Sequence, residues 1–267
     1  MPLLHLVLVA IVQGITEFLP VSSSGHLILL PNLTGLQDQG QVIDVAVHVG
    51  TLGAVVLYFW TDVRRALNGV RELLKGRLTS PNAQLALLLA LSAVPVVIAG
   101  LIFKLTGLSD ALRSVTVIAW ATLIFGLVLW WADRKGPTTQ SAENWSAKHA
   151  LSMGLWQALA LIPGTSRSGI TITGARHLGY ARPDAARLAM LMSIPTIIAS
   201  GTLLGLDVAL QMNAAAARDS AIAAIFAFIA ALGALHFMMR LLRTTSFTPY
   251  VIYRVLLGLG LLAYAYA

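Results

Sequence analysis

The sequence contains no cysteine, and charged residues make up only 11% of its 267 positions. The absence of cysteine excludes disulfides, thiolate metal sites and cysteine nucleophiles, and it leaves the redox compartment undecided. Soluble domains carry about 25% charged residues. Hydrophobic residues account for 57% of this chain, and its mean hydropathy is +0.80. A soluble fold of this length could not hide so much apolar surface, so a bilayer must be the solvent for much of the chain.

The formal net charge of +7 is modest evidence for an anionic partner. Lys and Arg gather on the cytoplasmic loops of membrane proteins, so much of this charge can serve to orient the chain. No basic stretch is interleaved with aromatic residues in a soluble module, which argues against a nucleic-acid partner. Membrane lipids are therefore the expected surroundings, and a homodimer is left open.

Six apolar runs are long enough to cross a bilayer, for which a helix needs roughly 20 residues. Two further regions, 3–30 and 149–180, are apolar at both ends but are broken in the middle by Pro, Gly and several hydroxyl residues. Non-helical backbone at membrane depth is tolerated only where protein or a water-filled cavity satisfies it. We therefore predict an all-α membrane protein in which these two regions are re-entrant helical hairpins. The six predicted spans lie near residues 42–60, 85–103, 115–132, 184–206, 220–240 and 249–266.

The two predicted hairpins resemble each other in sequence. Residues 13–25 and 157–169 both run twelve positions from a Gln to a Gly, with Pro and hydroxyl residues between them. Three long apolar runs follow each hairpin, so the chain is predicted to be a single membrane domain, residues 1–267, with internal repeats at about 1–135 and 145–267. The positions that correspond are Ser22 with Ser166, Ser24 with Ser168, and Ser23 with Arg167.

Each repeat contains three full spans, an odd number, so the second repeat should enter the membrane from the opposite side. Inverted repeats are typical of transporters, whose binding sites lie at broken helices near the membrane midplane. Alternating crossings place three basic loops on one side, which is therefore the cytoplasm, and both termini outside. The basic residues are Arg64, Arg65, Arg71, Lys75 and Arg77 in the first loop, Arg134, Lys135 and Lys148 in the second, and Arg240 and Arg243 in the third.

The first hairpin combines an acid, an amide, three hydroxyls and an imidazole within fourteen residues. Gln13 and Glu17 are four residues apart and share one face of a helix. Pro20 ends that helix, and the three serines that follow are placed to cap the next one, whose free N–H groups form an anion site. His26 can share a face with Ser23. Because an intramembrane carboxylate is costly and usually functional, Glu17 is a candidate site residue.

The second hairpin carries the positive charge. Pro163 and Gly164 break the chain, and Thr165 and Ser166 can cap a new helix that begins near Arg167. The planar guanidinium fork of Arg matches phosphate oxygens. Beside a helix N-terminus it would form a phosphate-binding site. For the flanking hydroxyl residues, helix capping or packing between membrane helices remains the alternative role.

Other polar residues within the apolar runs have simpler explanations. Arg254 lies inside the last run, where it is expected to reach an interface or to pair with a buried acid such as Asp44. The histidines other than His26 are expected to be interfacial or core residues, and no role is assigned to them; they are His5, His48, His149, His177 and His236.

The two hairpins together resemble a known family. The segments Gln13-x-x-x-Glu17-Phe-Leu-Pro-Val-Ser-Ser-Ser-Gly-His26 and Pro163-Gly-Thr-Ser-Arg-Ser-Gly-Ile-Thr171 resemble the two signature motifs of the undecaprenyl-pyrophosphate phosphatase (bacitracin-resistance) family. The resemblance covers essentially the whole chain. It implies a bacterial inner-membrane enzyme whose site opens to the periplasmic side. Such an enzyme removes the terminal phosphate of a polyprenyl pyrophosphate lipid, undecaprenyl pyrophosphate, and gives undecaprenyl phosphate, the lipid carrier of cell-wall synthesis.

The resemblance also implies site residues and a divalent cation, Mg²⁺ or Ca²⁺. Glu17, Ser23 and Arg167 would be the central residues, and His26 would be a further catalytic group. Glu17 would hold the cation, with help from the amide oxygen of Gln13, since both cations prefer oxygen ligands. Family members carry Glu or Gln at that position, and Gln13 removes one negative charge. The residues expected to support phosphate binding are Ser22, Ser24, Ser166, Ser168 and Thr171.

Two questions stay open at this point. Ser23 is the expected nucleophile, activated by His26 or Glu17, because a Ser hydroxyl is weak at its free pKa; in the rival version His26 is the nucleophile and Ser23 binds phosphate. The alternative function is a polyprenyl-phosphate transporter or flippase, which the inverted repeat supports. An anion channel fits less well, because Glu17 would repel the permeant ion.

Overall fold

The computed structural model describes residues 1–35, 37–211 and 213–267, without the side chains of 32–34, 110 and 205–211, and the described chain is almost entirely helical. Six of its helices are long and apolar enough to cross a membrane. The six predicted spans are therefore confirmed, with ends shifted by a few residues, and the chain is a multi-pass all-α membrane protein. These helices are α3 (Gly40–Tyr58), α5 (Pro81–Thr106), α7 (Val115–Lys135), α10 (Arg182–Gln211), α11 (Ala214–Leu241) and α12 (Thr248–Tyr266).

Both predicted hairpins are pairs of helices separated by a break. The first consists of α1 (Leu3–Phe18) and α2 (Ser23–Thr34). The second consists of α8 (Ala147–Ala158), a 3-10 turn η2 (Leu159–Leu161) and α9 (Arg167–His177). Their depth in a bilayer stays a prediction.

The two breaks have the same local geometry. Ser22 and Ser166 have left-handed backbone angles, φ 77° and φ 71°, which are uncommon outside glycine. Each serine caps the helix that follows, because Ser22 Oγ accepts from the backbone N–H of Gly25 at 3.3 Å and Ser166 Oγ accepts from that of Gly169 at 3.1 Å. The matched turns place Ser23 and Arg167 at the first positions of α2 and α9.

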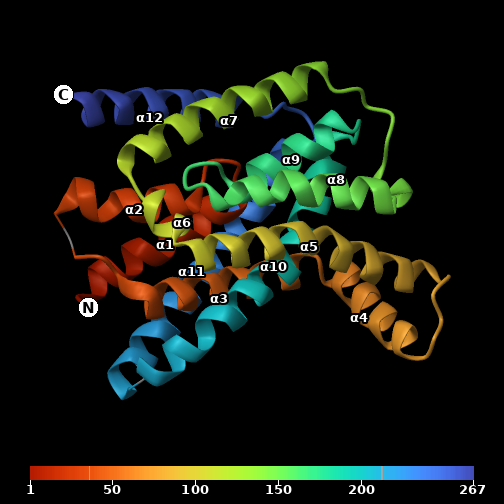
Figure 1. Cartoon of the computed structure of the whole chain (residues 1–267), viewed down its shortest axis with the longest axis horizontal. Coiled ribbons are helices and arrows are strands. Elements are labelled where there is room, and N and C mark those ends of the chain that lie inside the picture. The colour runs from red at the N-terminus through yellow and green to blue at the C-terminus, as the bar shows by residue number, and fades with distance from the viewer. Residues whose placement is uncertain (36, 212) are drawn as a thin grey trace.

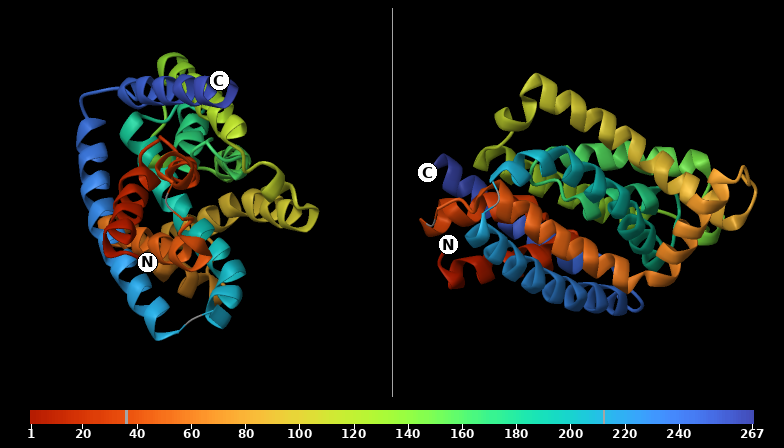
Figure 2. Two further views of the ribbon diagram at one scale, coloured as in Figure 1. Left: turned by 90° about the vertical axis from the view of Figure 1, so that its left-hand side faces the viewer. Right: turned by 90° about the horizontal axis from the view of Figure 1, so that it is seen from below.

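The hairpins enter the bundle from opposite ends. Figures 1 and 2 place both chain termini at one end of the long helices and the segment between α7 and α8 at the other. The N-terminal amine bonds to Asp219 at the start of α11 at 3.1 Å, and Thr139 N, beyond α7, bonds to Gly179 O after α9 at 3.0 Å. The breaks themselves meet inside the bundle, where Ser168 Oγ donates to Leu19 O at 2.9 Å.

One basic segment that was expected to be a loop is a helix, α4 (Trp60–Leu74). Its apolar residues recur at intervals of three and four, which places them on one helix face. Val63, Ala66, Leu67 and Val70 line a cavity of about 230 Å³ between α4, α5 and α10. The basic side chains of α4 lie at other positions, so α4 is an amphipathic helix. From the sequence, only its charges were considered, and a loop was therefore predicted. Two shorter elements are α6 (Leu108–Ala111) and η1 (Ala142–Asn144).

Small residues on α11 allow α1 and α3 to approach it closely. A Cβ on Gly50 of α3 would lie 2.2 Å from the carbonyl oxygen of Ala224, and a Cβ on Gly14 of α1 would lie 2.6 Å from that of Ala227. Such small-residue contacts drive association between membrane helices. They fix α1 and α3 side by side along α11, and both helices contribute to the site described below.

An ionic cluster fastens the outer end of the second hairpin. Asp133 at the end of α7 accepts from Arg176 Nε at 3.1 Å, from Arg182 Nε at 2.8 Å and from Phe247 N at 3.2 Å. Asp133 and Arg176 are both buried. The cluster joins the ends of α7 and α9 to the beginnings of α10 and α12.

Candidate functional site

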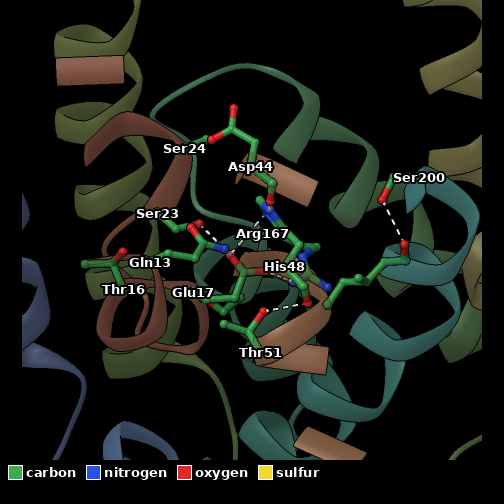
Figure 3. A network of polar contacts seen from close by, with 12 residues as sticks. Gln13, Thr16, Glu17, Ser23, Ser24, Asp44, His48, Thr51, Arg167 and Ser200 are labelled. Carbon is green, nitrogen blue, oxygen red and sulfur yellow. Dashed lines mark hydrogen bonds and ion pairs between the residues drawn. The ribbon is translucent and has the colours of Figure 1, made fainter. Parts of the chain in front are cut away.

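Glu17 lies at the centre of a polar network built from both hairpins (Figure 3). Its Oε1 accepts a hydrogen bond from Arg167 Nη2 in an ion pair. Its Oε2 accepts from Ser23 Oγ at 2.5 Å and from Gln13 Nε2 at 2.9 Å. Glu17 and Gln13 are buried. The structure thus brings together the acid, the amide and the serine of the first hairpin with the arginine of the second.

A cavity of about 290 Å³ opens beside this network. Six of the predicted site residues line it, and so do residues of α3, α5 and α10. The predicted residues are Glu17, Ser22, Ser23, Ser24, Ser166 and Arg167, and the others are His48, Val96, Ala160, Leu161, Thr196, Ile197 and Ser200.

The cavity concentrates groups that attract an anion. The first turns of α2 and α9 both begin at its wall, at Ser23 and Arg167, and a helix N-terminus carries free N–H groups and partial positive charge. Arg167 Nη1 is buried and has no hydrogen-bond partner in the described part of the chain. A buried unpaired guanidinium N–H is costly, so this atom is available to a ligand oxygen.

Three predicted residues lie behind the cavity wall. The hydroxyl of Ser168 donates to Leu19 O at 2.9 Å, and that of Thr171 donates to Arg167 O at 2.8 Å. Gln13 does not line the cavity but reaches it through its bond to Glu17. Ser168 and Thr171 therefore hold the backbone of the two breaks, whereas Gln13 orients the carboxylate.

His26 points toward α12 instead of the cavity. Its Nδ1 lies 2.6 Å from Ser22 O, so this nitrogen carries a proton and donates. Its Nε2 lies 2.5 Å from the hydroxyl of Tyr253, and the two rings stack with centroids 5.8 Å apart. Both imidazole nitrogens are engaged, and His26 is absent from the cavity lining.

The oxygens of Glu17 and Gln13 are the donor types that Mg²⁺ and Ca²⁺ take. Gln13 Oε1 is buried without a hydrogen-bond partner in the described chain, so one hard oxygen donor beside the carboxylate is unused. Within the described ranges, no three His, Asp or Glu side chains gather closely enough to hold a metal ion alone. The residues present therefore fit a cation that would share its remaining positions with water and with phosphate oxygens, as Mg²⁺ commonly does.

His48, to which the sequence analysis assigned no role, lies in the site. Its Nε2 is 3.8 Å from Glu17 Oε2, and its Nδ1 is held by the backbone oxygen of Asp44 at 2.7 Å. Thr196 and Ser200 of α10 also line the cavity. The available signal was the spacing of four residues between Asp44 and His48, and between Thr196 and Ser200, inside apolar spans. Such pairs put polar groups on one helix face.

Arg254 neither reaches an interface nor pairs with Asp44, so both expectations for it were wrong. Its side chain is 0% exposed. It donates hydrogen bonds to backbone carbonyls at the breaks of both hairpins, which satisfies groups that no helix bonds, and also to carbonyls on α7. These acceptors are the carbonyl oxygens of Pro20 at 3.3 Å, Thr122 at 3.1 Å, Gly164 at 3.1 Å and Thr165 at 2.9 Å.

Comparison with known proteins identifies the family. Residues 6–260 match the family described as bacitracin resistance protein BacA. The chain is 69% identical to an undecaprenyl-diphosphatase of Ruegeria pomeroyi and 67% identical to one of Dinoroseobacter shibae, each over 100% of both chains. It is 46% identical to the undecaprenyl-diphosphatase of Aliivibrio salmonicida over 96% of this chain and 95% of that protein. The chain therefore belongs to the bacitracin resistance protein BacA family.

Proposed function

We propose that this chain hydrolyses undecaprenyl diphosphate to undecaprenyl phosphate and inorganic phosphate, which recycles the lipid carrier of cell-wall synthesis. Relatives named undecaprenyl-diphosphatase match the full chain at 63–69% identity. The observation that carries the proposal is the hydrogen bond from Ser23 Oγ to Glu17 Oε2 in a cavity that also contains Arg167. A hydroxyl, a base and a phosphate-binding cation are the parts that phosphoryl transfer needs.

Ser23 is the proposed nucleophile and Glu17 its base. Ser23 Oγ attacks the terminal phosphorus while its proton passes to Glu17, and the bond from that phosphorus to the bridging oxygen breaks. Undecaprenyl phosphate leaves with the bridging oxygen. Glu17 then returns a proton as water attacks the phosphoserine, which releases inorganic phosphate and restores Ser23. The 2.5 Å hydrogen bond supports this assignment because a base must lie within reach of the proton it takes.

Charge stabilisation supplies most of the acceleration in phosphoryl transfer. Arg167 is proposed to bind the terminal phosphate through its unpaired Nη1, and the N-termini of α2 and α9 add partial positive charge. A Mg²⁺ or Ca²⁺ ion held by Glu17 and Gln13 would neutralise pyrophosphate oxygens when bound. Ser22, Ser24 and Ser166 line the same cavity.

The rival nucleophile, His26, has both ring nitrogens engaged and lies outside the cavity lining. This geometry supports Ser23. Rapid quenching of the enzyme with a polyprenyl diphosphate labelled in its terminal phosphate, followed by peptide mapping, separates the two versions. We expect phosphate on Ser23; acid-labile phosphate on His26 would contradict the assignment.

The proposed activity is tested with purified protein, a polyprenyl diphosphate and Mg²⁺ or Ca²⁺, by measuring released phosphate. Loss of the nucleophile in Ser23→Ala, or of the phosphate-binding guanidinium in Arg167→Ala, should slow turnover about 10²–10⁴-fold. Ser109→Ala, an exposed serine of α6 outside the cavity, is the matched control and should retain full activity. No release by the wild type would refute the enzyme and leave the polyprenyl-phosphate transporter, whose support is the pair of hairpins that enter from opposite ends.

The enzyme is proposed to lie in the bacterial inner membrane with its site opening to the periplasm. The cavity is lined by Val96 and Ser200, which lie past the middle of α5 and α10 on the way to the end that holds the termini. The basic loops lie at the other end, which the positive-inside rule assigns to the cytoplasm. The formation of a homodimer stays a prediction.

A further inference from the structure

A second cavity, of about 390 Å³, lies between α3 and α10. Val45, Val49 and Leu52 line it from one face of α3, and Ile198 and Leu204 line it from α10. The cleft is thus walled mainly by aliphatic side chains. Its volume is in the range of sites that hold organic ligands, about 300–1,000 Å³.

Three polar side chains of this cleft already have hydrogen-bond partners. Asp44 accepts a hydrogen bond from Gln39 at 2.7 Å. The hydroxyls of Ser200 and Thr202 donate to backbone oxygens of α10 at 3.1 and 2.8 Å. The hydroxyls of the cleft therefore need no hydrogen-bonding ligand, and its aliphatic walls suit a hydrocarbon.

The cleft opens sideways between the two spanning helices. Val49 is 56% exposed on α3 and Ile198 is 51% exposed on α10. Exposed aliphatic side chains in the middle of membrane-spanning helices face lipid. A chain of the bilayer can therefore pass into the cleft without crossing water.

The same cleft is continuous with the polar cavity. His48, Ile197 and Ser200 line both of them. In Figure 3, His48 projects from α3 beside Glu17, and Ser200 lies on α10 across from it. A molecule with a pyrophosphate at one end and a hydrocarbon at the other matches this pair of cavities in polarity and order.

We propose that the cleft between α3 and α10 is the binding site for the prenyl chain of the lipid substrate. The inference rests on the proposed function. It orients the substrate, because the terminal phosphate lies at Ser23 and Arg167 and the lipid-linked phosphate lies beside His48, where the two cavities join. The first isoprene unit lies where the two cavities join, the next units fill the cleft, and the rest of the chain continues into the bilayer.

The opposite side of α10 offers a smaller alternative. Gly100, Leu161 and Leu203 line a cavity of about 90 Å³ between α5 and α10, which also adjoins the polar cavity through Thr196 and Ser200. It is too small for a site of the usual size. The volumes therefore favour the α3 side, and the experiment below includes a variant for each side.

Glycines provide a way to fill each cavity separately. Gly201 lines the α3–α10 cleft, and a Cβ there would meet no atom of the described residues within 4 Å. Gly100 lines the smaller cavity, and a Cβ there would meet only Leu161 at 3.8 Å. Gly260 of α12 also has open space around its Cβ and lies outside both cavities. Gly201→Phe, Gly100→Phe and Gly260→Phe are thus matched substitutions at three places.

The test measures kcat and KM of the purified full-length variants on three diphosphates with 55, 15 and 5 carbons: undecaprenyl, farnesyl and isopentenyl diphosphate. Because each buried methylene contributes to binding, Gly201→Phe should raise KM about tenfold or more for the two longer substrates. Its kcat/KM for the five-carbon substrate should stay within about twofold of wild type, since that chain barely enters the cleft. Gly260→Phe should match the wild type on all three. Gly201→Leu replaces the Phe variant if the latter does not purify as a folded protein.

Three results would overturn the proposal: unchanged KM in Gly201→Phe, an equal loss on all three substrates, or a chain-length-dependent loss in Gly100→Phe alone. The last would place the prenyl chain on the α5 side of α10. A wild type that releases phosphate from none of the substrates would instead refute the proposed function, so the two failures are distinguishable.

Discussion

The guanidinium of Arg254 donates hydrogen bonds to backbone carbonyls that water would bond in a soluble protein. Both hairpins break inside the bundle, and the carbonyls of Pro20, Gly164 and Thr165 accept hydrogen bonds from this one side chain. In lipid, each unsatisfied backbone group costs several kcal/mol. A buried arginine with no acidic partner among the described side chains is thus explained by the carbonyl groups around it.

Replacing this side chain should destabilise the fold strongly. Arg254→Met keeps a long apolar side chain but removes the hydrogen bonds to the carbonyls of Pro20 and Thr165, so we expect a loss of at least about 3 kcal/mol in the free energy of unfolding. Thermal unfolding of the purified protein in detergent measures the effect. Arg243→Met, at an exposed position after α11, is the control and should change stability by less than about 0.5 kcal/mol. Equal melting temperatures for the two variants would contradict the role assigned to Arg254.

The sequence predicted those site residues whose relation is local. Gln13, Glu17 and Ser23 lie in one short hairpin, where helix periodicity and a proline determine which groups meet. The roles of His48 and Arg254 were not predicted, because they depend on which face of α3 or α12 turns toward the hairpins. That choice is made by packing between helices far apart in the chain, such as Gly50 against Ala224, and no local pattern reports it.

The close contact between α3 and α11 determines where α3 sits relative to the site. Gly50→Ala would place a Cβ against the carbonyl oxygen of Ala224, so the helices must separate. Overpacking of this kind costs about 1–3 kcal/mol, and we expect a lower melting temperature. Because His48 lies two residues from Gly50, phosphate release should fall as well.

The matched change for this contact is Gly233→Ala on α11, where a Cβ meets no atom within 4 Å. Alanine favours a helix over glycine by about 1 kcal/mol, so this variant should be as stable as the wild type or more stable. If Gly50→Ala were also neutral, the close approach of α3 and α11 would not constrain the site.

The long helices were predictable because hydropathy and length alone determine a membrane span. The breaks were predictable because proline and glycine interrupt helices. Helix α4 was not predicted. Its charges were interpreted as a topology signal only, and its apolar face, which includes Val63 and Val70, was not considered. Whether such a segment forms a helix depends on the packing of its apolar face against α5 and α10. That packing cannot be predicted from the sequence of the segment alone.

The orientation of the protein in the membrane can be tested with one exposed residue at each end of the bundle. Thr79 follows α4 at the end with the basic loops, and Ser109 lies in α6 at the end with the termini; both are exposed. The chain has no cysteine, so single Thr79→Cys and Ser109→Cys variants can be labelled without background. In intact spheroplasts, a membrane-impermeant maleimide should label Ser109→Cys and leave Thr79→Cys unlabelled until lysis.

The cysteine-free parent should remain unlabelled before and after lysis, which controls for other reactive groups. The opposite labelling pattern would mean that the protein has the inverted orientation in the membrane. The site would then open to the cytoplasm, and the proposed periplasmic localisation would be wrong.

Arg254 also limits how the molecule can move. Alternating access usually requires one repeat to rock against the other around a fixed site. Here one side chain of α12 is bonded to the breaks of both hairpins, and Ser168 of the second bonds directly to Leu19 of the first. Relative motion of the hairpins would have to rupture these bonds in each cycle, inside a medium that offers no replacement. The two hairpins therefore form a single rigid unit at the centre of the bundle. Conformational change is limited to the helices around it.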